Sequence, residues 1–251
     1  MRRPPTVGPA VLALLLTLGL AGCGAGPLAP AAPASTAPAS TAPAPTVTAV
    51  PSTPEAGGSA SNAATTTCDY PAAGEAAKAA TPPPTADVPT TGTLRYTLAL
   101  TGGPVTITMD RAKAPCTVNS FASLADQGYF DGTRCHRLTD SGFFVLQCGD
   151  PSGTGSGGPG YSFADETTGK ESYTTGVVAM ANAGPDTNGS QFFLVWSDST
   201  GLPPSYTIFG QMDTASRDVV AQMAGEGEDG SNGAGDGKPN NPSEITKVTK
   251  G

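Results

Sequence analysis

Histidine and charged side chains are scarce in this 251-residue sequence. It contains a single histidine, His136, which excludes a metal site made of several imidazoles and requires any Ser-His-Asp triad to use that residue. Lys and Arg number 13 against 21 Asp and Glu, which gives a formal charge of -8, and no basic stripe is present. A nucleic-acid partner therefore has no electrostatic basis in this chain.

Long apolar runs are also missing, and the one at residues 7–20 is too short for a stable membrane span. It follows Arg2 and Arg3 and ends in Leu20-Ala21-Gly22-Cys23. A basic start, a short apolar stretch and small residues before a cleavage site predict an export signal over residues 1–22. The last four residues resemble a bacterial lipoprotein signal, in which the cysteine becomes lipidated and begins the mature chain. The alternative is a plain secretory signal with an incidental cysteine.

The composition changes twice between this signal and the first strand pattern. Residues 23–67 are almost entirely Ala, Pro, Ser, Thr and Gly, so they lack the apolar bulk that offsets chain entropy. We expect them to form a disordered tether. Residues 68–90 contain Cys68 and an aromatic residue, and we interpret them as a segment that docks on the domain or links to it. Residues 91–251 are the predicted globular domain, long enough for a single core.

Periodic patterns within this domain predict many strands and two helices. Helices are expected at residues 114–127 and 216–224. Strands are expected at residues 94–100, 105–109, 134–138, 143–147, 176–179, 194–196, 206–210 and 245–248. The absence of a βαβ alternation indicates a mainly β fold, a closed and mostly antiparallel sheet capped by helices. The acidic, glycine-rich run at residues 226–236 lacks the ligand spacing of an EF-hand and is predicted to be a solvated loop.

Four polar residues at predicted strand ends point to a binding groove. Arg137 and Gln147 lie on strands joined by a short turn, so they should be neighbours across an antiparallel pair. Asn182 and Gln191 flank the loop between two later strands. If the four side chains share one face, they form a groove suited to a polar peptide backbone. The alternative is a hairpin loop with ordinary turn residues and no chemical role.

Several separated motifs occur in one order along the domain. They are His136-Arg137, residues 144–147, Gly149-Asp150, residues 180–185, residues 188–193 and Phe209-Gly210. Together they resemble the signature of the cyclophilin-type peptidyl-prolyl cis-trans isomerases, over a region from about Leu94 to Val248. The resemblance implies an eight-stranded antiparallel barrel closed by two helices, which agrees with the predicted elements. It also implies an enzyme that needs no cofactor and no metal.

The resemblance assigns roles to residues at the matching positions. The matching catalytic residues are Arg137, Gln147 and Asn182. The matching substrate-binding residues are His136, Phe144, Val145, Ala181, Ala183, Gln191, Phe193, Leu202 and Tyr206. Within this set, the apolar side chains would hold the proline ring, and residues 181–183 would run beside the substrate backbone. The chain has two residues more between His136 and Gln147 than is common in the family, so Phe143 and Phe144 could exchange roles. Gly201 stands where many members have tryptophan, which predicts weak cyclosporin binding.

The chemistry of the implied reaction explains why these residue types are needed. Rotation about an X-Pro bond faces a barrier of about 20 kcal/mol because amide resonance makes the bond partly double. A fixed cation that hydrogen-bonds to the proline nitrogen favours the twisted state over the planar one. Arginine suits this role because it stays charged and presents a planar fork. The alternative for Arg137 is a surface arginine paired with Asp140 or Asp150. The alternative for the function is a proline-peptide-binding or chaperone module with incidental catalysis.

Four cysteines remain after Cys23: Cys68, Cys116, Cys135 and Cys148. An even number in an exported domain predicts at least one disulfide. Cys135 and Cys148 could lie on neighbouring strands, and Cys68 needs a partner to explain its docking, but three connectivities stay open. The whole chain is thus expected to be a monomeric, extracytoplasmic isomerase of proline-containing polypeptides. Its membrane contact would be the lipid at Cys23.

Overall fold

The computed structural model describes residues 64–251. The predicted signal at residues 1–22, the lipidation of Cys23 and most of the predicted tether therefore lie outside the described residues. The tether was expected to reach residue 67, but strand β1 (Thr65–Thr66) pairs with β2 (Val88–Pro89) in a small antiparallel sheet. Composition places Thr65 and Thr66 in the tether, because backbone pairing with a distant segment is invisible in composition.

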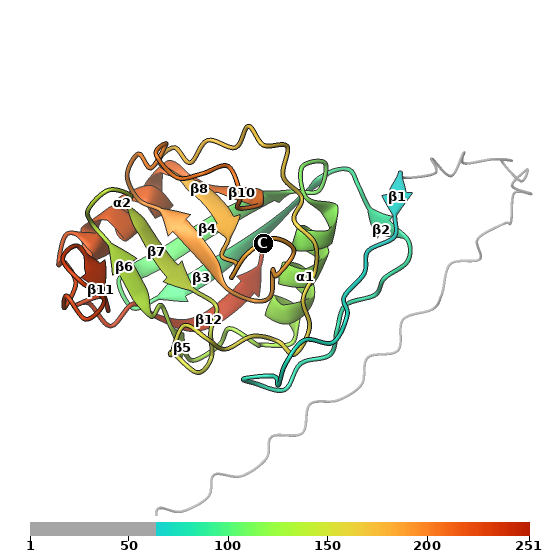
Figure 1. The fold of residues 1–251 in the computed structure, drawn as a ribbon, viewed down its shortest axis with the longest axis horizontal. Helices are drawn as coiled ribbons and strands as arrows, with labels where there is room; N and C mark the ends of the chain where they lie inside the picture. The colour runs from blue at the N-terminus through green and yellow to red at the C-terminus, as the bar shows by residue number, and fades with distance from the viewer. Residues whose placement is uncertain (1–63) are drawn as a thin grey trace, which may run out of the picture. The chain divides into compact units, whose positions relative to one another are not determined.

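The other ten strands form one sheet in which every pairing is antiparallel (Figure 1). They are β3 (Thr93–Leu100), β4 (Gly103–Asp110), β5 (Thr133–Arg134), β6 (Arg137–Thr139), β7 (Val145–Cys148), β8 (Val177–Met180), β9 (Phe192–Val195), β10 (Ile208–Met212), β11 (Asp236–Gly237) and β12 (Glu244–Lys250). Each strand predicted from sequence has a counterpart here. The two-residue strand β11 was not predicted, since it begins at the end of the glycine-rich run at residues 226–236, which was predicted to be a solvated loop.

The strand order corrects the expected closed, eight-stranded barrel. The order is β11-β6-β7-β9-β8-β10-β4-β3-β12-β5, a curled ten-stranded series with two ends, and no strand pairing among residues 64–251 joins these ends into a ring. One end, β5, is nevertheless close along the chain to β6, the second strand from the other end, because only Cys135 and His136 separate them. The backbone N–H of Cys135 donates to Ser243 beside β12, and that of His136 donates to Gln147 on β7. The break at these two residues is where the predicted single strand splits.

Two helices lie on opposite sides of the sheet in Figure 1. Helix α1 (Pro115–Asp126) starts with proline, which suits a first helical position, and buries Val118, Phe121 and Leu124 at helical spacing. Helix α2 (Thr214–Ala224) is capped by Asp213, whose side chain accepts from the backbone N–H of Ser216. Both helices were predicted; their starts differ from the prediction by one or two residues.

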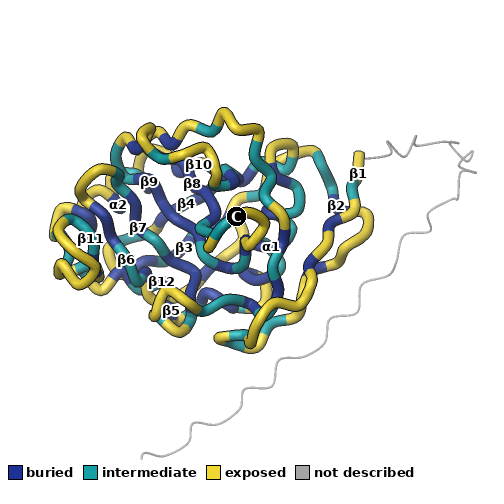
Figure 2. Tube along the Cα trace, in the orientation of Figure 1, coloured by how far each residue is buried: buried dark blue, intermediate teal, exposed yellow. Residues whose placement is uncertain are grey.

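In Figure 2 the buried residues gather along the strands of the large sheet, and the alternation of these strands divides the core into two clusters. The larger cluster fills the space between the sheet and the helices, with Phe121 near the centre of an aromatic group: Phe130, Phe192, Phe209 and Tyr96. The smaller cluster contains Val145, Tyr173, Val177, Ala179, Phe193 and Val195, with partly buried side chains packed on it. The smaller cluster reaches the surface, which makes it the candidate floor of a binding site.

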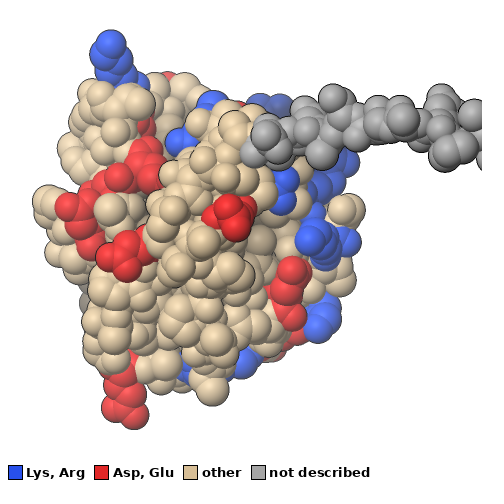
Figure 3. All heavy atoms as spheres, turned by 90° about the vertical axis from the view of Figure 1, so that its right-hand side faces the viewer, with Lys and Arg blue, Asp and Glu red and all other residues tan. Residues whose placement is uncertain are grey.

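Charged residues are spread over the surface. On the face in Figure 3, acidic and basic side chains occupy separate small areas, and uncharged residues cover most of the view. Among residues 64–251, no helix has both the length and the apolar character needed to cross a membrane.

Candidate functional site

Arg137 and Gln147 are direct cross-strand partners at the centre of the site. Arg137 opens β6 and Gln147 lies on β7, and their Cα atoms are paired in register. The Nη1 group of Arg137 donates to Oε1 of Gln147 at 3.2 Å. The prediction that these two residues are neighbours on adjacent antiparallel strands is confirmed.

A carboxylate that sequence reasoning missed holds the arginine from the other side. Nε of Arg137 donates to Oδ1 of Asp236 at 2.8 Å, and Nη2 donates to Oδ2 at 2.5 Å. The alternative partners considered for this arginine, Asp140 and Asp150, are both wrong. The hydrogen bonds to Asp236 raise the pKa of Arg137, and those from Arg137 lower the pKa of Asp236. Both groups are therefore charged at neutral pH.

Asp236 reaches the site because strand β11 pairs with β6. Asp236 is opposite Thr139, and Gly237 is opposite Leu138. The side-chain amide of Asn232 donates to Oδ1 of Asp236 at 3.1 Å, which fixes the carboxylate further. The segment predicted to be a solvated loop thus supplies, at its last residue, the counter-ion of the arginine.

The polar contacts continue from Gln147 in one direction. Because Oε1 of Gln147 accepts from Arg137, its amide nitrogen faces Gln191 and donates to Oε1 of that residue at 2.9 Å. The amide nitrogen of Gln191 donates in turn to the carbonyls of Gly155 and Gly157, both at 2.9 Å. Each amide has one possible orientation, so the row Asp236–Arg137–Gln147–Gln191 is fixed from end to end.

Asp150 shapes the glycine-rich loop at the end of this row. Its buried carboxylate accepts hydrogen bonds from Ser152 and from the backbone N–H groups of Gly155 and Gly157. Burial acts to raise the pKa of Asp150, but these hydrogen bonds outweigh it and leave the pKa lowered. The ionised carboxylate of Asp150 therefore binds the backbone of the glycine-rich loop. Because its oxygens are occupied there, it does not pair with Arg137.

A pocket of about 220 Å³, here called the inner pocket, opens beside Arg137 and has both apolar and polar side chains in its lining. Phe193 and Val145 form part of its lining and belong to the smaller core cluster. Tyr206 packs edge-on against Phe193, with ring centroids 5.5 Å apart. The full lining is Arg137, Phe143, Val145, Gln147, Ala181, Asn182, Phe193, Leu202 and Tyr206. A small apolar ring placed here would lie next to a guanidinium.

Four predicted site residues do not line this pocket: Ala183 and Gln191, which line the second pocket described below, and Phe144 and His136, which line neither. Phe144 points the other way and packs edge-on against Trp196, with ring centroids 5.1 Å apart. Phe143 lines the pocket instead, with the Arg137 guanidinium 5.5 Å from its ring centroid. The sequence spacing left open which of the two phenylalanines faces the site, and the structure shows that it is Phe143. Burial lowers the pKa of His136, and neither ring nitrogen has a hydrogen-bond partner among the described residues. His136 is therefore a neutral residue behind the site.

Asn182 lines the inner pocket, but its side chain already has partners within the protein. The amide nitrogen donates to the carbonyl of Ser205 at 3.0 Å and to Asp165 at 3.3 Å. The amide oxygen accepts from the backbone N–H of Gly184 at 3.3 Å. This side chain ties its own strand end to the loop that carries Tyr206, so both of its N–H groups are already used within the protein.

A second pocket of about 570 Å³, here called the outer pocket, adjoins the inner one. The two share Gln147, Ala181 and Asn182, and the outer pocket also contains the predicted residues Ala183 and Gln191. One wall of the outer pocket consists of residues 73–75, from the segment before the predicted domain. The site is thus a continuous surface, in which the larger apolar side chains Phe143, Phe193 and Leu202 lie in the inner pocket.

Two buried residues that sequence reasoning missed position the pocket wall. The hydroxyl of Tyr173 donates to the carbonyl of Tyr206 at 3.0 Å and accepts from its backbone N–H at 2.9 Å. Ser199 accepts from the backbone N–H of Phe144 through its hydroxyl and from that of Leu202 through its carbonyl. Both lie in irregular segments, so no periodic signal in the sequence could have found them.

The four cysteines form two disulfides, Cys68–Cys116 and Cys135–Cys148. The second joins the β5–β6 junction to the end of β7, directly behind Arg137 and Gln147. The first ties the segment before the domain to the start of α1. The prediction of at least one disulfide is confirmed, and one of the three open connectivities is selected.

A family model described as "Cyclophilin type peptidyl-prolyl cis-trans isomerase/CLD" matches residues 95–250. Among curated proteins, the "Probable peptidyl-prolyl cis-trans isomerase B" of Mycobacterium leprae is 46% identical over 183 residues. The alignment covers 65% of this chain and 62% of that protein. The protein of the same name from Mycobacterium tuberculosis is 44% identical over 196 residues, with 72% of this chain and 63% of that protein covered. The chain thus spans somewhat less than two thirds of the length of these relatives.

Solved structures give the same comparison in three dimensions. A cyclophilin-type peptidyl-prolyl cis-trans isomerase from Cryptosporidium parvum superposes with a TM-score of 0.56 at 28% identity, and covers 64% of this chain and 98% of its own. A second crystal structure of that protein, determined in the presence of the dipeptide Ala-Pro, gives 0.55 at 29% identity over 62% and 97%.

Proposed function

We propose that this chain, which belongs to the cyclophilin-type peptidyl-prolyl cis-trans isomerase family, accelerates rotation about X-Pro bonds in polypeptides. The observation that carries the proposal is the fixed guanidinium of Arg137 at a pocket whose lining includes the apolar side chains of Phe193 and Val145. A proline ring would pack against these side chains, and its nitrogen would then face the cation. The crystal structure of the Cryptosporidium parvum relative in the presence of the dipeptide Ala-Pro supports a ligand that contains proline.

The geometry around Arg137 suits stabilisation of a twisted amide. The guanidinium of Arg137 has five N–H donors, and three of them donate hydrogen bonds to Asp236 and Gln147. Two donors therefore remain for a substrate. As the X-Pro bond twists, the proline nitrogen loses resonance with the carbonyl and gains a lone pair that accepts a hydrogen bond. A donor that is already oriented favours this state without reorganisation during the reaction. The reaction needs no proton transfer to or from the protein.

The strand end at Ala181 and Asn182 would hold the peptide that precedes the proline. Both residues line the inner and the outer pocket, so a substrate backbone that leaves the inner pocket passes them. Rotation requires one end of the bond to be held while the other turns. In this arrangement the inner pocket holds the ring, and the backbone of residues 181–182 holds the preceding segment.

An assay of isomerisation in an X-Pro peptide tests the proposal with Arg137→Ala. We expect the variant to lose about 100-fold or more in kcat/KM, as is typical when an oriented electrostatic donor is removed. Arg134→Ala is the matched control, because Arg134 is on β5, the strand before β6 in the chain, and its side chain is 71% exposed. This variant should retain activity. If the wild type is no faster than solvent, or Arg137→Ala is undiminished, the enzyme is ruled out. Peptide binding without acceleration would instead favour a binding or chaperone module.

The location of the enzyme is a separate part of the proposal. We propose that the chain acts outside the cytoplasm as a monomer, anchored by lipid on Cys23 after removal of residues 1–22. The motif Leu20-Ala21-Gly22-Cys23 supports this, and two disulfides suit an oxidising compartment. In bacterial cells, Cys23→Ala should move the chain from the membrane fraction to the soluble fraction. The proposed anchor is wrong if the variant stays with the membranes.

A further inference from the structure

We propose that Glu75 gives the outer pocket a preference for substrates with a basic residue two or three positions before the proline. The proposal rests on the isomerase function above and adds a substrate class to it. It concerns a segment that precedes residues 95–250, the part matched by the family model. The contribution is therefore a property of this chain's own N-terminal segment.

The wall that carries Glu75 is built into the domain by backbone pairing. Ala72 forms an antiparallel bridge with Tyr161, and the backbone N–H of Ser162 donates to the carbonyl of Pro71 at 3.0 Å. The backbone N–H of Ala73 donates to Gly160 at 2.9 Å, and that of Ala77 donates to Gly158 at 2.9 Å. These bonds lie on both sides of Glu75, so the backbone at this position is fixed beside the glycine-rich loop.

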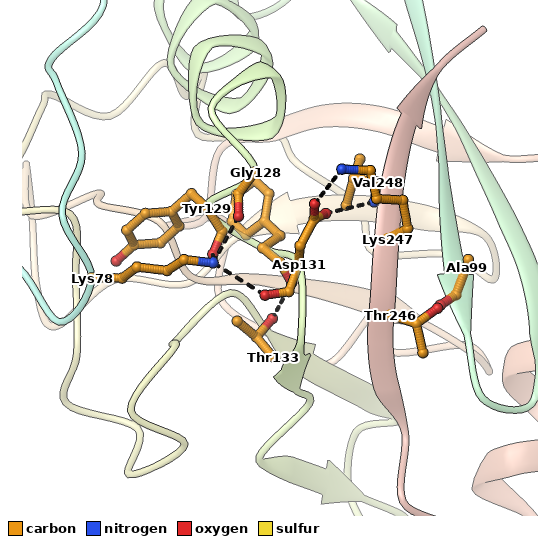
Figure 4. Close-up of polar contacts among 10 residues, drawn as sticks. Lys78, Ala99, Gly128, Tyr129, Asp131, Thr133, Thr246, Lys247 and Val248 are labelled. Carbon is orange, nitrogen blue, oxygen red and sulfur yellow. Dashed lines mark hydrogen bonds and ion pairs between the residues drawn. The ribbon is translucent and has the colours of Figure 1, made fainter.

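The same segment is held at two further points. The disulfide Cys68–Cys116 ties its beginning to the N-terminal turn of α1. Farther along, Nζ of Lys78 donates to three backbone carbonyls just beyond α1: Gly128 at 2.7 Å, Tyr129 at 3.1 Å and Asp131 at 3.1 Å (Figure 4). Figure 4 shows Lys78 extending from the segment toward this turn. A wall fixed in this way presents its side chains to a ligand at little cost in ordering.

Charge in the outer pocket comes from one residue. Glu75 is the only charged residue among those described as lining it, and the others are small, polar or aromatic. Its side chain is exposed and makes no ion pair with another described residue. An unpaired carboxylate at the wall of a peptide-binding surface attracts a lysine or arginine of the peptide and repels an acidic residue.

The position of the basic residue follows from the continuity of the two pockets. With the proline in the inner pocket, the preceding chain passes Ala181 and Asn182, which both pockets share. An extended peptide advances about 3.3 Å per residue, so the second and third residues before the proline reach the outer pocket. Long basic side chains then have the reach to approach the opposite wall.

The test compares X-Pro peptides that differ only in the residue two or three positions before the proline: Lys, Ala or Glu. For the wild type we expect kcat/KM about two- to five-fold higher with Lys than with Ala, and lower with Glu, since exposed ion pairs have this strength. Glu75→Gln should remove the preference, Glu75→Lys should reverse it, and added salt should reduce it in the wild type. The rate with the Ala peptide is the reference for each of the three proteins.

Asp69→Asn is the matched control, because Asp69 is exposed on the same segment but borders a different pocket. It should leave the preference unchanged. Equal rates for the Lys, Ala and Glu peptides in an active wild type would overturn the inference while leaving the isomerase function intact. A wild type that processes none of the peptides would instead refute the function on which it rests.

Discussion

At the scale of single residues, Arg137 is an ion-paired group and not a free cation. Asp236 takes two of its N–H groups and Gln147 a third, so the guanidinium has lost most of its rotational freedom. The carboxylate also offsets part of the positive charge that faces the substrate. Orientation and charge therefore act in opposite directions, and substitutions at Asp236 separate the two effects.

We expect Asp236→Ala to lower kcat by about ten-fold with little change in KM, because an arginine released from its partner spends less time in the reactive geometry. Asp236→Asn keeps an acceptor for the guanidinium and removes the charge, so it should retain most of the activity. Steady-state rates on an X-Pro peptide measure both variants.

Asp140→Ala is the matched control for this pair. Asp140 is an exposed acidic residue next to β6 that makes no ion pair among the described residues, so its loss should leave kcat unaltered. A kcat for Asp236→Ala equal to that of the wild type, in a folded protein, would show that the ion pair has no positioning role.

The residues of the site were predictable to different degrees from the sequence. Arg137 and Gln147 could be paired because a short connection between two strands forces an antiparallel register. Asp236 could not be found, since it is 99 residues from Arg137 in a run without periodicity. Phe143 and Phe144 could not be told apart, because neighbouring residues of an irregular segment do not reveal which one faces inward.

At the scale of elements, α1 and the segment before the domain form one unit. Tyr70 donates to the carbonyl of Cys116 at 2.8 Å, Asn119 donates to the carbonyl of Pro84 at 2.9 Å, and Gln127 donates to that of Thr81 at 3.0 Å. The segment thus follows the helix from its first turn to its last, as the ribbon in Figure 1 shows. Composition indicated that this segment docks, but not that it borders a pocket.

Breaking the disulfide Cys68–Cys116 should destabilise this unit. The bond closes a sequence separation of 48 residues, and a cross-link over such a loop contributes about 2–4 kcal/mol to the free energy of unfolding. Cys68→Ala, Cys116→Ala and the double variant should therefore lose similar amounts, because each removes the same bond. Denaturant unfolding measures the loss.

The double variant provides the internal check on this prediction. Losses that add up across the two single substitutions would mean that the cysteines act independently. The disulfide is also refuted if mass spectrometry of the non-reduced wild type finds free thiols at both positions.

At the scale of the whole molecule, the strand pattern in the sequence was sufficient to predict an antiparallel, mainly β domain with two helices. It was not sufficient for the strand order. Pairings such as β11 with β6 involve two residues each, too few to leave a periodic signal. Closure of the sheet was predicted from the strand pattern and the count of eight strands from the resemblance to a family, and the structure replaces both with an open series of ten strands.

The pairing of β12 with β3 has a consequence for how the protein is made. The last strand of the chain lies beside the first strand of the large sheet, and the hydroxyl of Thr246 donates to the carbonyl of Ala99 across a separation of 147 residues. During synthesis, β3 leaves the ribosome long before its partner exists. The sheet can therefore be completed only after β12 has also emerged, and such distant pairings fold slowly.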